Sequence, residues 1–184
     1  MILVVGLGNP TDEYQGTRHN LGRELVARWQ KTSGAADFSF DKKWNALVSK
    51  KIKVVLLLPE TFMNKSGNAV GPAARFFKIK PKDIVVLHDD ADIELGRAKL
   101  SFGKHSAGHK GVESVKRTLG MWDFWRLRVG IQRKKRVEAE KLVLQKLKPD
   151  EQKTVKKLEK KIFEGLELFA VGKTEKAVGI INGA

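Results

Sequence analysis

The stretch Ile2–Pro10, with the sequence ILVVGLGNP, joins four consecutive apolar residues to a glycine-rich turn. A short, uninterrupted apolar run is typical of a strand that is buried on both faces of a sheet. Glycines let the turn after it bend tightly and approach a ligand closely. Apolar residues then recur at helical spacing over residues 20–32, with Asn20 as the expected N-cap. This part of the chain predicts a strand, a tight turn and a helix, as in α/β proteins.

The same two patterns alternate along the rest of the chain. Apolar runs predict strands at residues 1–5, 44–49, 52–58, 84–88, 97–102 and 126–131. Helical spacing predicts helices at about 20–32, 66–78, 109–119, 138–147, 150–170 and 173–181. The expected fold is an α/β three-layer sandwich, with a mixed, mostly parallel central sheet flanked by helices. Because no internal repeat and no Pro- or Ser-rich linker interrupts the pattern, residues 1–184 are predicted to form one domain.

The charge of the chain favours a polyanionic partner. Its 36 Lys and Arg residues exceed its 21 Asp and Glu residues, giving a net charge of +15. Such an excess neutralises phosphates and releases their counterions. Residues 133–161 hold twelve of the basic residues and five of the acidic ones, which fits either contact with RNA or a solvated helical face. Charge alone leaves open a nucleic acid partner, a ribosomal or lipid association, and plain solubility.

Composition also excludes several classes of protein. The chain has no cysteine, so disulfides, thiolate catalysis and cysteine metal sites are excluded. No apolar run approaches the roughly 20 residues that span a bilayer, and no secretion signal is recognised. We therefore expect a cytoplasmic protein without a membrane partner.

The chemistry is predicted to centre on His19, the side chain in its motif that can exchange a proton near neutral pH. The third glycine of a dinucleotide fingerprint would fall on Thr11, and no Gly-x-Ser-x-Gly elbow occurs. His105 and His109 lie in an expected loop without the glutamate of a zinc-protease helix. Residues 88–92 (HDDAD) favour a hydrogen-bonding cluster over a cation site. No metal and no cofactor is predicted, and a histidine without a side-chain nucleophile points to water as the nucleophile.

Five motifs resemble those of the bacterial-type peptidyl-tRNA hydrolase family and occur in the same order. They are GLGNP with TRHNLG (6–10 and 17–22), TFMNKSG (61–67), HD (88–89), GHKG (108–111) and RLRVGI (126–131). The resemblance implies hydrolysis of the ester that joins a peptide to the 3′-terminal ribose of tRNA. It also implies that the partner is the acceptor stem and 3′ end of peptidyl-tRNA, and that the enzyme is a monomer.

The resemblance assigns roles to individual residues. His19 would be the general base that activates water, and Asp89 would orient the imidazole and stabilise its protonated form. The positions that match the family's substrate groove are Asn9, Tyr14, Phe62 and Asn64. The Asn9 amide would engage the substrate near the scissile bond, and the Asn64 amide would hold the peptide backbone. The two aromatic residues could also serve packing alone.

Two positions depart from the family's pattern. Lys110 stands where the family has an asparagine, which exchanges a donor and acceptor for a charged donor. It would either meet the substrate's phosphate or face solvent. Arg128 matches the arginine of the family's clamp for the 5′-phosphate of tRNA. The clamp's lysine falls on Ser101, so Lys99 or Lys104 would have to replace it.

Two other functions stay open at this point. Plant organelle RNA-splicing factors share the fold and act as RNA scaffolds without hydrolysis. A general nucleic-acid-binding protein would bind in a salt-dependent way without turnover. The retention of the Asn9, His19, Asn64 and Asp89 set favours the enzyme.

Overall fold

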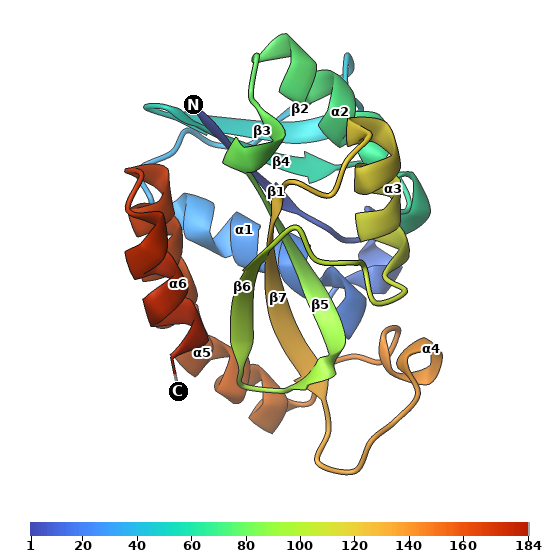
Figure 1. Ribbon diagram of the computed structural model, residues 1–184. Coiled ribbons are helices and arrows are strands. Elements are labelled where there is room, and N and C mark those ends of the chain that lie inside the picture. Colours follow the sequence, from blue (N-terminus) through green and yellow to red (C-terminus); the bar gives the residue numbers. More distant parts are fainter. Residues whose placement is uncertain (184) are drawn as a thin grey trace.

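A seven-stranded sheet, in the order β2-β3-β4-β1-β5-β7-β6, forms the centre of the computed structural model, which describes residues 1–183 (Figure 1). Its strands are β1 (Ile2–Gly6), β2 (Ser39–Asp41), β3 (Ala46–Lys51), β4 (Val54–Pro59), β5 (Ile84–Glu94), β6 (Ala98–Phe102) and β7 (Trp125–Gln132). The central strands β4, β1, β5 and β7 pair in parallel, whereas β2, β3 and β6 join at the two sides by antiparallel pairing. The mixed sheet and the antiparallel β3–β4 pair are as predicted.

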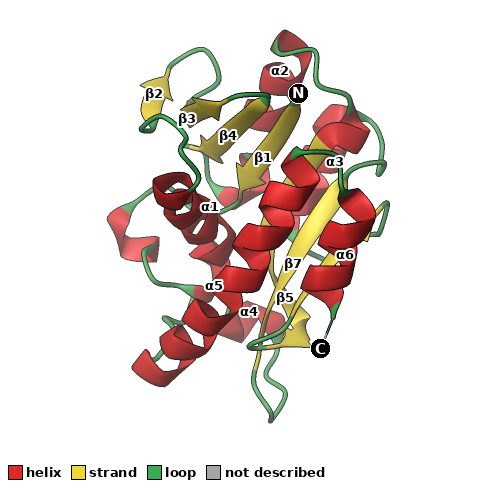
Figure 2. Ribbon diagram, turned by 90° about the vertical axis from the view of Figure 1, so that its left-hand side faces the viewer, coloured by secondary structure: helices red, strands yellow, loops and turns green. Residues whose placement is uncertain are grey.

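Helices cover both faces of this sheet and complete the three layers. They are α1 (Leu21–Thr32), α2 (Gly67–Phe76), α3 (Lys110–Leu119), α4 (Ala139–Leu142), α5 (Pro149–Ala170) and α6 (Thr174–Asn182). Helices α1, α5 and α6 share one apolar core with the sheet, and α2 and α3 share the other. Helices α5 and α6 lie side by side in Figures 1 and 2. No helix within residues 1–183 is both long enough and apolar enough to cross a bilayer.

The continuous apolar runs of the strands follow from this double cover. In β1, Val4 packs into the core beneath α1, while Leu3 and Val5 pack into the core beneath α2 and α3. Successive side chains of a strand point to opposite faces, so a strand covered on both sides needs apolar residues at every position. The same alternation in β5 decides which way its polar residues point beyond the core.

The structure corrects three details of the sequence prediction. Strand β5 runs on to Glu94 instead of ending at His88, because β7 continues to pair with it. The predicted helix over 138–147 is reduced to the single turn of α4, because residues 143–147 bond to the segment before α1 instead. The short edge strand β2 was not predicted.

The site forms where strand β5 extends beyond the end of its neighbour β1. Strand β1 ends at Gly6, which is paired with Leu87, so no described strand pairs with β5 beyond this point on that side. Helix α1 approaches β5 closely, since a Cβ at Gly22 would lie 2.2 Å from the carbonyl oxygen of Leu87. The missing side chain at Gly22 lets the start of α1 lie directly against the backbone of β5.

Candidate active site

Asp89 points at the start of α1 because of its position in β5. It follows Val85 and Leu87 on the face that α1 covers, at alternate positions of the strand. The 3₁₀ turn Arg18–Asn20 precedes α1 and carries His19 to the same place. Asp89 is 2% exposed and His19 is partly exposed, so the imidazole lies between a buried carboxylate and solvent.

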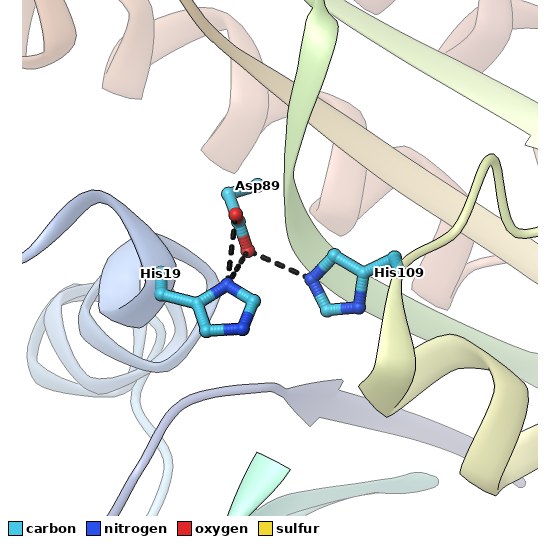
Figure 3. Close-up of side chains that lie close together, drawn as sticks. All are labelled: His19, Asp89 and His109. Atoms are coloured by element: carbon cyan, nitrogen blue, oxygen red, sulfur yellow. Dashed lines mark hydrogen bonds and ion pairs between the residues drawn. The ribbon is translucent and has the colours of Figure 1, made fainter. Parts of the chain in front are cut away.

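Two histidines bond to the one carboxylate (Figure 3). Nδ1 of His19 lies 2.9 Å from Oδ2 and 3.0 Å from Oδ1 of Asp89, and Nε2 of His109 lies 2.8 Å from Oδ1. The ring centroids of the two histidines are 5.0 Å apart. Sequence reasoning correctly paired His19 with Asp89 but did not count His109 among the site residues.

The hydrogen bonds give the two rings different tasks. His109 is the N-cap of α3, and its Nδ1 accepts a hydrogen bond from the N–H of Val112 at 3.3 Å. In the neutral ring the proton therefore lies on Nε2, which donates to Asp89, and both nitrogens are engaged. His19 uses only Nδ1 on Asp89, which leaves Nε2 to accept a proton. Of the two, His19 is the ring that can act as a base.

The carboxylate of Asp89 stays ionised in this setting. Burial by itself would raise its pKa, but the charge and hydrogen bond of His109, followed by those of His19, hold the pKa well below the ordinary value. A persistent negative charge beside His19 stabilises the imidazolium that forms when the ring accepts a proton.

Hydrogen bonds from its neighbours fix Asn9, and they leave its side-chain NH₂ group unused. The N–H of Asn9 donates to Oδ1 of Asn20, and Nδ2 of Asn20 donates to the Asn9 carbonyl, both at 2.8 Å. Oδ1 of Asn9 accepts from the N–H of Met63, also at 2.8 Å. This bond fixes the direction of the Asn9 side-chain amide and leaves its NH₂ group as a donor toward the pocket.

Asn20 takes the predicted N-cap position of α1, but without the expected side-chain capping bond. Its amide instead bonds both backbone groups of Asn9, eleven residues away, and it belongs to the support of the site. A cap is a local pattern, and this contact depends on the turn that brings the two segments together.

A pocket of about 650 Å³ opens over His19 and Asp89. Of the substrate residues predicted from sequence, those in its lining are Asn9, Tyr14, Phe62, Asn64 and Lys110. The rings of Tyr14 and Phe62 meet edge to face with centroids 6.4 Å apart. The turn after Ser106 and the segment around Val143 and Leu144 complete the wall.

Arg128 lies apart from this pocket, on the far side of Asp90. Its Nε donates to Oδ2 of Asp90 at 2.7 Å, which leaves both terminal nitrogens of the guanidinium for another partner. In the β6–β7 pair, Lys99 stands directly opposite Arg128, and Ser101 stands opposite the buried Arg126. Lys104 lies beyond the end of β6.

His88 is directed to the other face of β5 and does not line the pocket, although its ring meets that of His109 with centroids 4.7 Å apart. Its Nδ1 donates to the carbonyl of Asp89 at 2.7 Å, and its Nε2 faces NH1 of Arg126 at 3.5 Å. Burial, with the charges of His109 and Arg126, keeps its pKa well below the ordinary imidazole value. Burial also lowers the pKa of Arg126 to about 10, with a contribution from Arg128.

Only one group of residues in 1–183 has the spacing of a metal site. His19, Asp89 and His109 each offer a ligand atom, and these atoms lie within 4.8 Å of one another. The same atoms are joined by the hydrogen bonds described above, which need no ion. Their arrangement suits proton transfer to His19 from a water molecule in the pocket.

The family model and the relatives that match this chain carry the same description. A family model described as peptidyl-tRNA hydrolase matches residues 3–184. The chain is 45% identical over 129 residues to a peptidyl-tRNA hydrolase of Thiobacillus denitrificans and 47% identical over 131 residues to one of an Azoarcus species. These alignments cover 70% of the chain but 63% and 60% of the relatives, less than two thirds of their length.

Solved structures give a fuller match. The crystal structure of peptidyl-tRNA hydrolase from Acinetobacter baumannii superimposes with a TM-score of 0.91 at 33% sequence identity. The superposition covers 100% of this chain and 95% of that one. The match of the folds therefore extends over the whole described chain.

Proposed function

The chain belongs to the peptidyl-tRNA hydrolase family, and on this premise we propose that it hydrolyses the ester bond between a peptide and the 3′-terminal ribose of its tRNA. The product would be free tRNA for reuse in translation. The proposal rests on the hydrogen bonding of His19. Its Nδ1 is bonded to Asp89, and its Nε2 is left for a water molecule in the pocket.

The reaction needs one base and one nucleophile. Nε2 of His19 takes a proton from water as the oxygen attacks the ester carbonyl. Asp89 stabilises the resulting imidazolium, and His109 holds Asp89 in place from the other side. When the ester C–O bond breaks, the imidazolium returns the proton to the 3′-oxygen of the ribose. Water is consumed, and the peptide acid and the tRNA leave.

The pocket supplies contacts that do not depend on the peptide's side chains. The NH₂ group of Asn9 donates to a substrate carbonyl near the scissile bond, since its Oδ1 is already used by Met63. Asn64 binds the peptide backbone through its exposed amide, and Tyr14 and Phe62 form an apolar wall. Backbone contacts suit an enzyme that accepts peptides of many sequences.

The tRNA is bound by basic residues outside the pocket and at its rim. Arg128 contacts the 5′-phosphate of the tRNA with the two guanidinium nitrogens that Asp90 leaves unused. Lys99, its neighbour across β6 and β7, is the second half of the clamp in place of Ser101. Lys110, exposed at the first position of α3 and at the rim of the pocket, meets a phosphate at the 3′ end of the tRNA. The protein is proposed to act as a monomer in the cytoplasm.

Incubation of the protein with N-blocked aminoacyl-tRNA tests this function. The expected result is release of the N-acyl amino acid, with the His19→Ala variant as the matched control. An RNA scaffold would bind the same tRNA and leave the ester intact. Binding without release by the unmodified protein would therefore reject the hydrolase in favour of the scaffold.

A further inference from the structure

Two segments far apart in the sequence are bonded together beside the site. Residues 16–19 precede α1, and residues 143–147 follow α4. The N–H of Arg18 donates to the Gln145 carbonyl at 3.0 Å, and the N–H of His19 donates to the Val143 carbonyl at 2.8 Å. The N–H of Leu147 donates back to Gly16 at 3.0 Å. The backbone of the proposed base is thus attached directly to one wall of the pocket.

The Arg18 side chain reinforces this attachment. It is 0% exposed, and its NH1 donates to the carbonyls of Gln145 and Lys146 at 3.2 and 2.8 Å. Its NH2 donates to both carboxylate oxygens of Glu151 at 2.6 Å. One guanidinium therefore holds two consecutive carbonyls of the second segment and the start of α5 at the same time.

Glu151 connects this arrangement to the rigid part of the fold. It lies in the first turn of α5, and its Oε2 also accepts from the N–H of Lys148 at 2.8 Å. A carboxylate is favoured at this end of a helix by the helix dipole. Further along α5, Leu158, Ile162 and Leu166 pack into the core of the sheet. The position of Arg18 is thereby set by the core.

Stability alone gives a poor account of this pair. Removing two charges from water costs free energy, and replacing a buried ion pair with apolar groups is often neutral or stabilising. The Nε atom of Arg18 is buried and has no hydrogen-bond partner within residues 1–183, which adds to that cost. What an apolar pair could not supply is the fork that binds the carbonyls of residues 145 and 146 in fixed directions.

We propose that Arg18 and Glu151 are positioning residues, which fix His19 and the Val143–Leu144 wall relative to each other across the pocket. This inference rests on the proposed hydrolysis for its effect on rate, but its geometry can be tested without it. Arg18 acts on the base through the backbone of its neighbour and touches no substrate.

The test compares two double variants. Arg18→Met/Glu151→Gln removes the charges but keeps an acceptor for the N–H of Lys148. Lys51→Met/Glu167→Gln is the matched control, because that ion pair of 2.7 Å also anchors α5 but lies away from the pocket. The midpoint of thermal unfolding, kcat for N-blocked aminoacyl-tRNA and the NMR ring resonances of the four histidines are measured for each.

The Arg18 variant should unfold within a few degrees of the wild type yet lose about tenfold to a hundredfold in kcat, as small displacements of a catalytic group do. The ring resonances of His19 should shift while those of His105 stay. The control should match the wild type in both. Wild-type kcat and an unshifted His19 in the Arg18 variant would overturn the proposal.

A single variant covers the case in which the double variant does not fold. Arg18→Lys keeps the charge but lacks the fork, so it should show the same shift of His19 and the same loss of kcat. If the Arg18→Lys variant has the kcat and the His19 resonances of the wild type, the role of the fork is overturned. If the wild type itself releases no product, the proposed hydrolysis fails, and the His19 resonances still decide whether Arg18 positions that ring.

Discussion

The side-chain amide of Asn20 bonds both backbone groups of Asn9, donating to the carbonyl and accepting from the N–H at 2.8 Å each. Both residues are buried, so neither bond is replaced by water if it is lost. The pair fixes the turn after β1, and with it the amide that points into the pocket.

Asn20→Ala should therefore reduce both stability and turnover. Leaving the two Asn9 backbone groups unpaired costs about 1–3 kcal/mol for each group in the free energy of unfolding. The loosened Asn9 should also raise KM for N-blocked aminoacyl-tRNA. Denaturant unfolding and steady-state kinetics check the two effects. An unchanged KM in a destabilised variant would assign Asn20 to folding alone.

His19 and His109 both bond to Asp89, but their replacement should have unequal effects. His19→Ala removes the base and should lower kcat by about 10²–10⁴-fold while tRNA binding stays intact. His109→Ala leaves the base in place and removes one hydrogen bond from Asp89, so its loss should be smaller. Single-turnover kinetics with saturating enzyme measure both. Equal losses would make His109 a second proton-transfer group.

Buried His88 should make the protein less stable below about pH 6.5. Its pKa is lowered in the fold, so it stays neutral there while the unfolded chain binds a proton below about pH 6.5. Its contribution is complete above that pH and falls by about 1.4 kcal/mol per pH unit below it, until the folded protein binds the proton too. The lowered pKa of Asp89 acts in a separate window, below about pH 4.

Unfolding in denaturant between pH 7.5 and 5.0 measures this slope. His88→Gln keeps a donor and an acceptor and should flatten the slope by about one proton, whatever its effect at pH 7.5. Parallel curves for the two proteins would show that His88 does not contribute to the acid dependence.

The sequence predicted those parts of the fold that the core determines. Strand β1 and helix α1 were found because double-sided burial and a helical apolar face leave periodic patterns in the chain. Helix α4 was overestimated because residues 143–147 have helical spacing but are bound by Arg18, which no local pattern records.

Most of the site residues that belong to a sequence motif were predicted. The residues that support the site through contacts between distant parts of the chain were missed. The pairing of His19 with Asp89 was expected and is present. His109 was quoted within a motif but not counted, although its place before a helix and between glycines is a pattern that sequence could have used. Asn20 and Arg18 act through partners that only the folded chain brings near.

Lys99 and Arg128 should act together on the tRNA body. Directly opposite residues of an antiparallel pair have Cβ atoms about 4.5–5.5 Å apart, so both cations can reach one phosphate. Lys99→Ala and Arg128→Ala should each raise KM for full-length tRNA substrates and lower the salt slope by about one contact. A minimal substrate without the tRNA body should be spared. Lys104→Ala is the control, and an equal effect there would reject the assignment of Lys99.

Lys110 places a positive charge where the helix dipole of α3 is already positive. It is the first residue of α3 and is exposed at the rim of the pocket. A cation at this end of a helix is unfavourable by about 0.3–1 kcal/mol. Lys110 therefore lowers the stability of the folded protein slightly. A phosphate at the 3′ end of the tRNA would turn the same charge into an attraction.

Substitution should therefore change stability and binding in opposite directions. Lys110→Glu should raise the midpoint of thermal unfolding, because a carboxylate suits the N-terminus of α3, yet it should raise KM for tRNA substrates most strongly at low salt. Lys110→Asn should keep kcat and weaken low-salt binding less. Thermal unfolding and kinetics at two salt concentrations give both quantities for the three proteins. A KM that is the same for all three would mean that Lys110 faces solvent and makes no contact with the substrate.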